Sequence, residues 1–238
     1  MSLKILTLIP ARSGSKGLRH KNVQQVGGLT LLERTIKLAQ ESIRHREQWS
    51  IVVSTDSPGY AKIACLAGAE VPFLRPPFLA NDTARLTKVI AHALMYMQNQ
   101  KRPFDMVIML SPTTPLTLPK DVRAAINLYK KHQSAVISVT TDRTAPSWRF
   151  TINNGQLLAP ARRRIVHRQE EPKSYVLNGA IYIASPQWLK RHKQFYATSA
   201  RALIMPPERS LDIENKHDLN IAQLLIEQSK KSGRIKKS

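Results

Sequence analysis

The 238-residue chain has one cysteine and few acidic residues. A single cysteine, Cys65, excludes an internal disulfide and a zinc cluster built on cysteines. It stands in "YAKIACLAGAEV", where we expect a buried thiol on a helix rather than a nucleophile. No apolar run approaches the roughly 18 residues that span a bilayer, and the first residues carry no cleavage-site pattern. These absences predict a cytoplasmic protein without a membrane partner.

Acidic residues are so scarce that the charge is unbalanced: 16 Asp and Glu stand against 37 Lys and Arg, for a formal net charge of +21. Such a field attracts anions, whether nucleotide, nucleic acid or acidic lipid. The excess is spread along the chain, so a surface of solvated lysines explains it equally well. With 42% hydrophobic and 22% charged residues, the composition is that of an ordinary globular domain.

Strand-like and helix-like segments alternate for most of the length. The apolar run 4–9 stops at Pro10, as a buried parallel strand should. Further strands are expected at 50–56, 70–75, 105–110 and 134–140. Helices are expected over 29–43, from Pro58 onward, over 83–97 and over 119–132. This alternation predicts an α/β fold with a mainly parallel sheet, which binds ligands at the carboxyl ends of its strands. The unusual loops all follow strands, at 10–22, 54–58, 75–83 and 111–117.

The alternation breaks between 141 and 178, where Asn-Asn-Gly turn chemistry and dense arginine predict a β-hairpin excursion. Regular structure returns with strands at 180–185 and 201–205, a short helix at 186–192 and a final helix at 215–228. We therefore expect one domain over 1–228, with 141–178 inserted, and a disordered basic tail over 229–238.

The stretch "IPARSGSKGLRHKN" (9–22) places four cations after the first strand, Arg12, Lys16, Arg19 and Lys21. It is not a P-loop, because Ser15-Lys16-Gly17 reverses the order that the P-loop needs. Gly14 and Gly17 permit close approach of the backbone, whose N–H groups add to anion binding. The position and composition favour a polyphosphate cradle over a solvated basic loop.

The second candidate is the acidic pair in "SLDIENKHDL" (210–219). Asp212 and Glu214 lie two residues apart, so an extended backbone points both carboxylates to one face, where they suit a hard divalent cation that carries phosphates. The alternative is a helix cap, with Glu214 or Asn215 at the start of the final helix. In a chain this short of acids, a pair facing a basic loop favours a metal site.

Two weaker signals remain. The stretch "RRRIVHRQ" (162–169) suits an anionic substrate, nucleic acid or solvent, and we assign no catalytic role to His167. The stretch "SPTTP" (111–115) puts small hydroxyl groups at the end of the fourth strand, where they suit positioning a polar ligand.

Taken together, these motifs resemble the acylneuraminate cytidylyltransferase family, the CMP-sialic acid synthetases. After the first loop, the family's order continues with "VSTD", "FLRPPFLANDTA", "LSPTTPL", "RQ" at 168–169, "NGAIYI" at 178–183 and "SLDIENKHDL". The resemblance covers about residues 4–228. It implies a Rossmann-like three-layer sheet and a homodimer joined through a hairpin excursion such as 141–178.

The resemblance also implies transfer of CMP from CTP to the anomeric hydroxyl of a nine-carbon 2-keto-3-deoxy acid sugar, with release of pyrophosphate. The residues that it implies as nucleotide-binding are Arg12, Ser15, Lys16, Lys21, Asn22, Arg75 and Ser111. Arg12, Lys21 and Asp212 would be catalytic, with Lys21 near the charge that develops on the α-phosphate. Asp212 and Glu214 would hold Mg²⁺ or Mn²⁺. The acid-sugar site would comprise Arg168, Gln169, Asn178 and Tyr182, closed by the partner's hairpin.

This sequence departs from the family pattern at several positions. Ser111 replaces a usual glutamine, Glu214 replaces a usual aspartate, and Val176 stands where some sialic-acid enzymes have arginine. Three further departures are Thr117, Arg85 and Leu86. The nucleotide and metal residues are kept while the sugar pocket is altered, so we expect a bacterial nonulosonic acid such as legionaminic acid rather than N-acetylneuraminate.

Three alternatives stay open. One is a related nucleotidylyltransferase for an eight-carbon acid sugar or a sugar phosphate. Another is a nucleic-acid-binding protein, although no recognition-helix, RNA-binding or OB-fold pattern is present. The third is a catalytically degenerate relative that only binds nucleotide.

Overall fold

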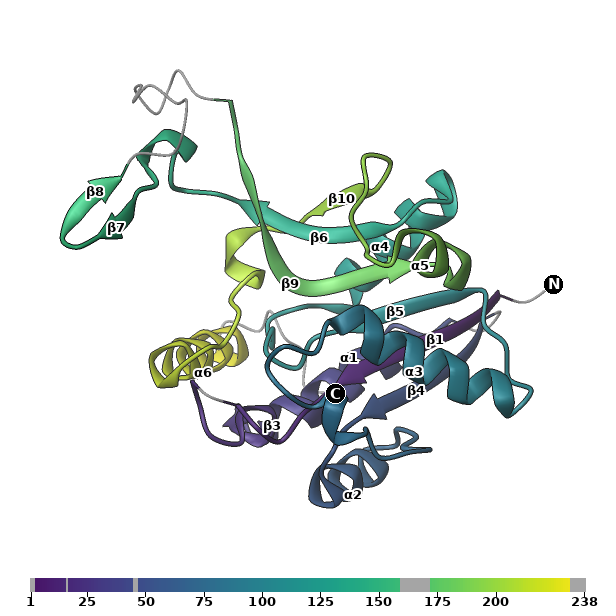
Figure 1. Cartoon of the computed structure of the whole chain (residues 1–238). Coiled ribbons are helices and arrows are strands. Elements are labelled where there is room, and N and C mark those ends of the chain that lie inside the picture. Colours follow the sequence, from purple (N-terminus) through teal and green to yellow (C-terminus); the bar gives the residue numbers. More distant parts are fainter. Residues whose placement is uncertain (1–2, 16, 45–46, 159–171, 232–238) are drawn as a thin grey trace.

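The computed structural model describes residues 3–15, 17–44, 47–158 and 172–231. Within these ranges, the main sheet has six strands in the order β10-β6-β9-β5-β1-β4 (Figure 1). Their bounds are β1 Leu3–Pro10, β4 Glu47–Ser54, β5 Met106–Leu110, β6 Val136–Thr141, β9 Tyr175–Ala184 and β10 Arg201–Ile204. All neighbouring pairs are parallel except those of β9, which runs antiparallel between β5 and β6. The predicted mainly parallel α/β sheet is confirmed.

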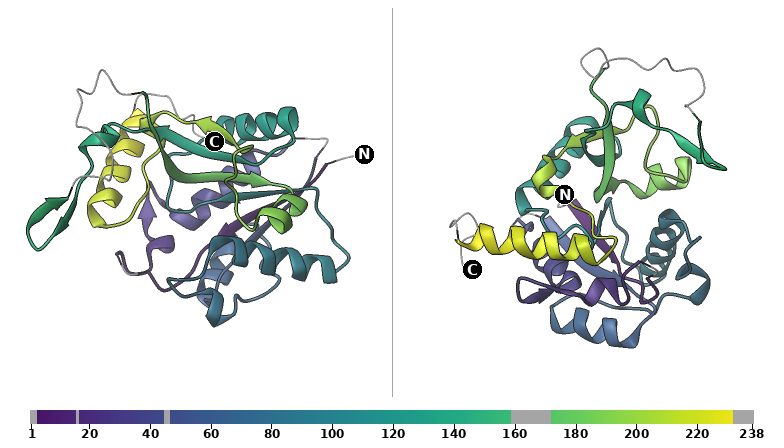
Figure 2. Two further views of the ribbon diagram at one scale, coloured as in Figure 1. Left: turned by 45° about the horizontal axis from the view of Figure 1, so that its top comes forward. Right: turned by 90° about the vertical axis from the view of Figure 1, so that its left-hand side faces the viewer.

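Helices cover both faces of this sheet. Their bounds are α1 Leu31–Glu41, α2 Pro58–Leu66, α3 Leu86–Asn99, α4 Pro119–His132, α5 Pro186–His192 and α6 Lys216–Lys231. Ile5 and Ile9 of β1 pack in one core with α1 and α4, whereas Leu6 and Leu8 pack in a second core with α3 and α5. Successive strand residues point to opposite faces, so β1 serves both cores. The right-hand view in Figure 2 shows the resulting three layers, with the sheet between two layers of helices.

Local signals explain where α1 begins and why α4 has its predicted bounds, whereas the expected helices 29–43 and 83–97 are observed as Leu31–Glu41 and Leu86–Asn99. The α1 helix begins after Thr30, whose Oγ1 accepts from the Glu33 N–H at 3.1 Å while Glu33 Oε2 accepts from the Thr30 N–H at 2.8 Å. The α4 helix has the predicted bounds, with Pro119 in its first turn and Gln133 in the left-handed conformation at its end.

Two expectations were wrong. The segment 70–75 is not a regular strand but makes two isolated bridges, Val52 with Glu70 and Thr55 with Leu74. Pro72 between them has no N–H for a ladder hydrogen bond. Cys65 is exposed rather than buried, because α2 turns Tyr60 and Ala64 toward the core instead.

The chain leaves the main sheet between β6 and β9, as predicted. Strands β7 (Thr151–Asn153) and β8 (Gln156–Leu158) form an antiparallel hairpin turned at Asn154 and Gly155, whose φ values are 48° and 79°. Together with the 3-10 turn Pro146–Trp148 they form what we call the hairpin segment (residues 146–158), which projects from the body of the molecule (Figure 1). The rest of the insertion, from 159 to 171, lies outside the described residues.

The final helix extends three residues into the predicted tail, to Lys231, and 232–238 lie outside the described residues. Among the described helices, none combines the length and apolar character needed to cross a membrane.

Candidate active site

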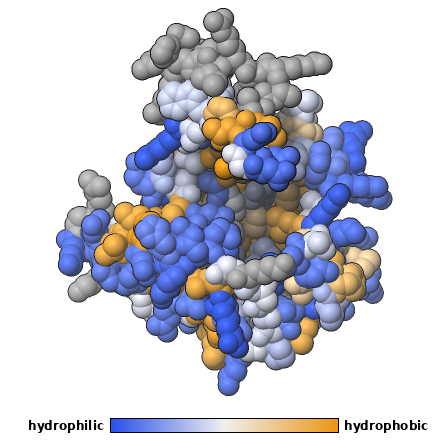
Figure 3. All heavy atoms as spheres, turned by 60° about the vertical axis from the view of Figure 1, so that its left-hand side comes forward, coloured by the Kyte–Doolittle hydropathy of each residue, from blue (hydrophilic) through white to orange (hydrophobic). Residues whose placement is uncertain are grey.

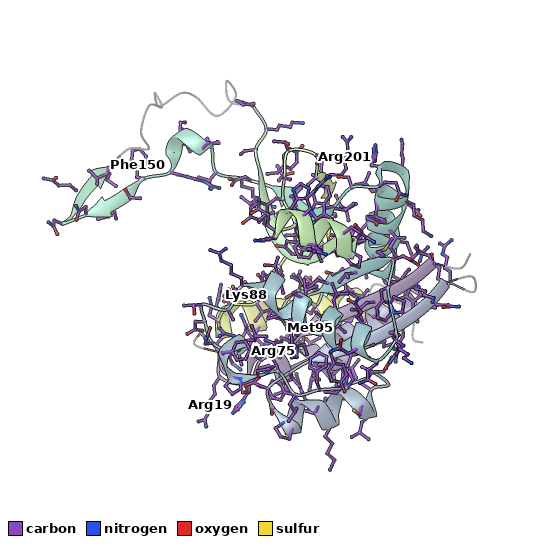
Figure 4. All side chains as sticks on the ribbon, turned by 45° about the vertical axis from the view of Figure 1, so that its right-hand side comes forward. Arg19, Arg75, Lys88, Met95, Phe150 and Arg201 are labelled. Atoms are coloured by element: carbon purple, nitrogen blue, oxygen red, sulfur yellow. The ribbon has the colours of Figure 1, made fainter. Side chains whose placement is uncertain are left out.

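A pocket of about 380 Å³ opens at the carboxyl ends of β1 and β5. The side of the molecule that carries the hairpin segment comes forward in Figure 3, and its surface is hollowed below that segment. The pocket residues that the sequence predicted are Arg12, Ser15, Lys21, Asn22, Arg75, Ser111 and Glu214. The wall also contains Leu79, Asn81, Asp82, Ala84, Leu86 and Thr113. Lys16 lies outside the described residues, and Arg19 is exposed at the periphery (Figure 4).

The basic loop (residues 11–22) is held in place by its own backbone and by an acid that the prediction missed. The Ser13 N–H and Oγ donate to the two Asp56 carboxylate oxygens at 2.8 and 2.6 Å. Although burial raises the pKa of Asp56, these hydrogen bonds outweigh it and the net pKa is lowered. Asn22 is buried, and its Nδ2 donates to the Arg12 carbonyl at 2.9 Å. The signal for Asp56 was its place at the end of "VSTD", directly after β4.

Two cations of the described pocket wall, Arg12 and Lys21, are paired with carboxylates. Arg12 contacts Asp82 at 2.6 Å, and Lys21 contacts Glu214 at 3.0 Å. Asp82 was not predicted as a site residue, because nothing in the sequence shows that the loop before α3 turns back to face the first loop. The predicted meeting of the basic loop with the acidic segment does occur, through Lys21 and Glu214.

A further cation, Arg75, is buried at 5% exposure and lines the pocket (labelled in Figure 4). Its Nε donates to Ser54 Oγ at 3.0 Å, and its Nη2 donates to the Ser54 carbonyl. Burial lowers the pKa of Arg75 to about 10, with a further lowering from Arg12 against the opposing effect of Asp56. Even so it stays protonated at neutral pH. The pocket therefore presents a fixed charge that an anion would stabilise.

The acidic segment (residues 210–219) lies against the loop that follows β5 and against β9. Ile213 donates its N–H to the Thr113 carbonyl at 2.8 Å, and Thr113 Oγ1 lies 2.9 Å from Ser111 Oγ. Asp212 is half-buried beside them and accepts a hydrogen bond from the Thr113 side chain. Burial, then the nearby Glu214 and Asp218 carboxylates, raise the pKa of Asp212, opposed by the Thr113 bond and Lys21.

Asp212 and Glu214 fit a divalent cation in one specific respect. Within the described chain, Asp212 Oδ1 is buried and has no hydrogen-bond partner. A buried carboxylate oxygen with no partner is destabilising unless a cation or donor arrives. In the same part of the chain, no cluster of three or more His, Cys, Asp or Glu side chains could hold a metal ion. Mg²⁺ does not need such a cluster, because one or two carboxylates plus substrate phosphates satisfy it.

The described residues that were predicted to bind an acid sugar do not line this pocket. Arg168 and Gln169 lie outside the described residues. Tyr182 is half-buried and stacks on Phe195, with ring centroids 5.1 Å apart. Burial and the neighbouring Asp212 raise the pKa of Tyr182. Asn178 is buried at 4% exposure and bonds to protein groups on two sides. Neither Asn178 nor Tyr182 lines the 380 Å³ pocket.

Comparison with known proteins decides the family. Residues 6–230 match the family model described as Cytidylyltransferase. The chain belongs to the cytidylyltransferase family. The resemblance found in the motifs is thus confirmed, and with it the expectation of an enzyme.

Curated relatives of this cytidylyltransferase span most of its length. It is 35% identical over 229 residues to a CMP-N,N'-diacetyllegionaminic acid synthase of Legionella pneumophila, covering 94% of this chain and 97% of that protein. It is 31% identical over 236 residues to a pseudaminic acid cytidylyltransferase of Campylobacter jejuni, covering 97% and 100%. It is 33% identical over 238 residues to an N-acylneuraminate cytidylyltransferase of Escherichia coli, covering 99% of this chain but 55% of that protein.

Solved structures share the fold at lower identity. A CMP:2-keto-3-deoxy-manno-octonic acid synthetase complexed with CTP aligns with a TM-score of 0.69 at 17% identity, covering 95% of this chain and 99% of that one. A 4-diphosphocytidyl-2C-methyl-D-erythritol synthase aligns with a TM-score of 0.67 at 14% identity, covering 95% and 99%. At these identities the comparison establishes the fold.

Proposed function

We propose that this cytidylyltransferase transfers CMP from CTP to the anomeric hydroxyl of a nine-carbon 2-keto-3-deoxy acid sugar and releases pyrophosphate. The relatives that cover most of the chain carry the names of nonulosonic acid enzymes, which supports this acceptor class. A legionaminic acid is the acceptor we favour, because synthases of that name are relatives from two bacteria and because the sugar-side motifs depart from the N-acetylneuraminate pattern.

The observation that carries the proposal is the set of cations around the pocket. Arg12 and Lys21 are paired with the carboxylates of Asp82 and Glu214, while Arg75 is buried below them. A triphosphate would take the place of these carboxylates and bring its charge against three cations. Phosphoryl-type transfer depends on positioning and charge neutralisation, and fixed cations provide both. Lys21 would lie against the α-phosphate, and Asn22 would keep the loop in its binding conformation.

We also propose a divalent cation, Mg²⁺ or Mn²⁺, held by Asp212 and Glu214. The unpartnered Asp212 oxygen supports this assignment. When bound, the cation would neutralise phosphate charge. Glu214 would then turn from Lys21 toward the cation, which leaves the Lys21 ammonium free for the nucleotide.

A homodimer formed through the hairpin segment completes the proposal. An isolated two-stranded hairpin is marginally stable in water. The exposed apolar side chains of this one are Trp148, Phe150, Ile152, Leu157 and Leu158. A patch of this kind on a projecting hairpin fits a second copy of the chain.

The test is pyrophosphate release from CTP and Mg²⁺ with a panel of acid sugars: N,N'-diacetyllegionaminic, pseudaminic, N-acetylneuraminic and the eight-carbon 2-keto-3-deoxy acid. We expect release with a nine-carbon acid and the highest kcat/KM with the legionaminic acid. Preference for the eight-carbon acid would reassign the acceptor. CTP binding without release on any acceptor would identify a degenerate relative. Salt-sensitive, nanomolar binding of nucleic acid would support the remaining alternative.

A further inference from the structure

The pairing of strand β9 with β6 is irregular near the segment that carries Asp212 and Glu214. Ile137 of β6 pairs with Tyr182, and Val139 pairs with Leu177, so β6 advances by two residues while β9 advances by five. The extra residues lie in 178–181, the sequence Asn-Gly-Ala-Ile, which we call the bulge segment. Bulges beside functional sites re-aim side chains away from the regular strand direction.

Buried hydrogen bonds hold the bulge segment. Ser138 Oγ donates to Asn178 Oδ1 at 2.6 Å and accepts from the Ile181 N–H at 2.8 Å. The Ala180 N–H also donates to Asn178 Oδ1, at 3.3 Å. On its other side, Asn178 Nδ2 donates to Ser210 Oγ at 2.9 Å and approaches the Met205 sulfur at 3.4 Å. An amide offers two donors and two lone pairs, so these four contacts use its full capacity.

Ser210 belongs to the carboxylate loop (residues 206–214), which carries Asp212 and Glu214. Its Oγ donates to the Pro206 carbonyl at 2.9 Å, a bond within the loop. The same Oγ accepts a hydrogen bond from the Asn178 amide. After Asp212, a second hydrogen bond holds the loop, from the Ile213 N–H to the Thr113 carbonyl. Asp212 thus lies between two anchors, and the Asn178–Ser210 bond is the first of them.

The bulge segment also lies close to the Asp212 carboxylate. Gly179 has a φ of 73°, and a Cβ on it would lie 3.2 Å from Asp212 Oδ2. No side chain fits there without moving the carboxylate. The strand conformation that the Asn178 hydrogen bonds hold therefore places Gly179 next to the Asp212 carboxylate.

We infer that Asn178 is a positioning residue, which acts through Ser210 to hold the Asp212 carboxylate, rather than a contact of the acid sugar. Its amide is buried, fully bonded to protein and directed toward the carboxylate loop. A satisfied buried network of this kind is rigid, and losing a member loosens the group it orients. The inference rests on the proposed role of Asp212 as a metal ligand.

The experiment measures Mn²⁺ affinity by EPR titration, with and without CTP, on the full-length Asn178→Ala, Ser210→Ala and double variants. We expect each single variant to weaken Mn²⁺ binding by ~10-fold and to lower kcat, with the KM for the acid sugar changed less than about twofold. The double variant should bind Mn²⁺ as tightly as Asn178→Ala does, because both substitutions remove the same Asn178–Ser210 hydrogen bond. Ser210→Thr, which keeps the hydroxyl, should restore binding.

Ser134→Ala is the matched control, because it removes a buried serine that precedes β6 and whose Oγ donates to the Ser199 carbonyl rather than to Asn178 or the carboxylate loop. It should leave Mn²⁺ binding unchanged. A rise in sugar KM for Asn178→Ala, with Mn²⁺ affinity unchanged and Ser210→Ala neutral, would overturn the inference in favour of direct sugar contact. If Asn178→Ala does not fold, the Ser210 variants decide alone.

Asp212→Asn in the same assay separates the two proposals. If it abolishes Mn²⁺ binding while the Asn178 and Ser210 variants bind normally, only the positioning role fails. If it leaves Mn²⁺ binding intact, the metal assignment fails and the positioning inference fails with it.

Discussion

At the scale of single residues, Arg12 and Lys21 of the described pocket wall are each paired with a carboxylate that a phosphate would have to displace. The Arg12–Asp82 pair, at 2.6 Å, is partly exposed on both sides. Removing Asp82 as a competitor should therefore strengthen nucleotide binding. We predict that Asp82→Asn tightens CTP binding about two- to fivefold, the range of an exposed ion pair. Calorimetric titration of CTP measures the effect.

Glu70→Gln is the control for that prediction, because Glu70 pairs with Arg102 at 2.7 Å with similar exposure but outside the pocket wall. It should leave CTP affinity unchanged. Weaker CTP binding by Asp82→Asn would mean that Asp82 holds Arg12 in its binding position rather than competing with the ligand.

Asp212 should matter for turnover and not for folding. Its carboxylate is half-buried near Glu214 and Asp218, and its buried Oδ1 has no partner in the described chain. A neutral amide of the same shape relieves that charge. We predict that Asp212→Asn lowers kcat by more than ~100-fold while the Tm does not fall. Steady-state kinetics and a thermal melt provide both numbers, and a near-normal kcat would remove the metal assignment.

At the scale of elements, the basic loop and the carboxylate loop meet backbone to backbone. A Cβ on Gly17 would lie 2.4 Å from the Glu214 carbonyl oxygen, whereas one on Gly14 would meet nothing within 4 Å. We predict that Gly17→Ala pushes the loops apart and weakens CTP binding by ~10-fold, because the displaced loop no longer aligns its phosphate-binding groups. Gly14→Ala is the matched control in the same titration. Equal affinities for the two variants would show that this contact does not position the loop.

A second prediction at this scale concerns the attachment of α4 to β4. The Glu47 carboxylate accepts from Arg123 at 2.7 and 3.1 Å, from Lys130 at 2.8 Å and from Trp49 at 3.1 Å. Burial alone would raise the pKa of Glu47, but these bonds outweigh it and lower the pKa from 4.5 to about 2. When a carboxyl group has a lower pKa in the folded state than in the unfolded state, its ionised form stabilises the protein at pH values above the unfolded-state pKa. This stabilisation is lost as the pH falls to the folded-state pKa.

We therefore predict that Glu47→Gln lowers the free energy of unfolding by roughly 2–3 kcal/mol at pH 7. The difference from wild type should shrink between pH 4.5 and pH 2. Urea unfolding at a series of pH values measures it. Glu47 is remote from the pocket wall, so kcat/KM at pH 7 should not change. A difference that is constant with pH would show that packing rather than the charge is responsible.

At the scale of the whole molecule, the hairpin segment exposes apolar side chains on a projecting pair of strands. Ile152 and Leu157 are 73% and 69% exposed on paired strands. We predict that Ile152→Glu shifts a dimer toward monomer by at least ~10-fold in Kd, since it places a charge in an apolar contact. Light scattering after size-exclusion chromatography reports the mass. Leu224→Glu, on an equally apolar exposed position of α6, is the control. A monomeric wild type at micromolar concentration would contradict the proposal.

Sequence reasoning succeeded where the deciding contacts are local. The bounds of α4 follow from Pro119 and the residues around it, and the β7–β8 turn follows from Asn154 and Gly155. It failed for Cys65, because the identity of the small residues around it does not show which side of α2 meets the core. Asp56 and Asp82 were missed for a related reason: each meets the basic loop across a large separation in the chain.

The sequence by itself determined the alternation of strands and helices, the basic loop after the first strand and the family, because periodicity, turn residues and motifs act within a few residues. Only the tertiary structure decided which carboxylates meet Arg12 and Lys21, and that the Asn178 amide points to Ser210. Those contacts depend on how strands far apart in the chain are placed side by side. The bulge in β9 redirects Asn178 in a way that strand alternation alone cannot indicate.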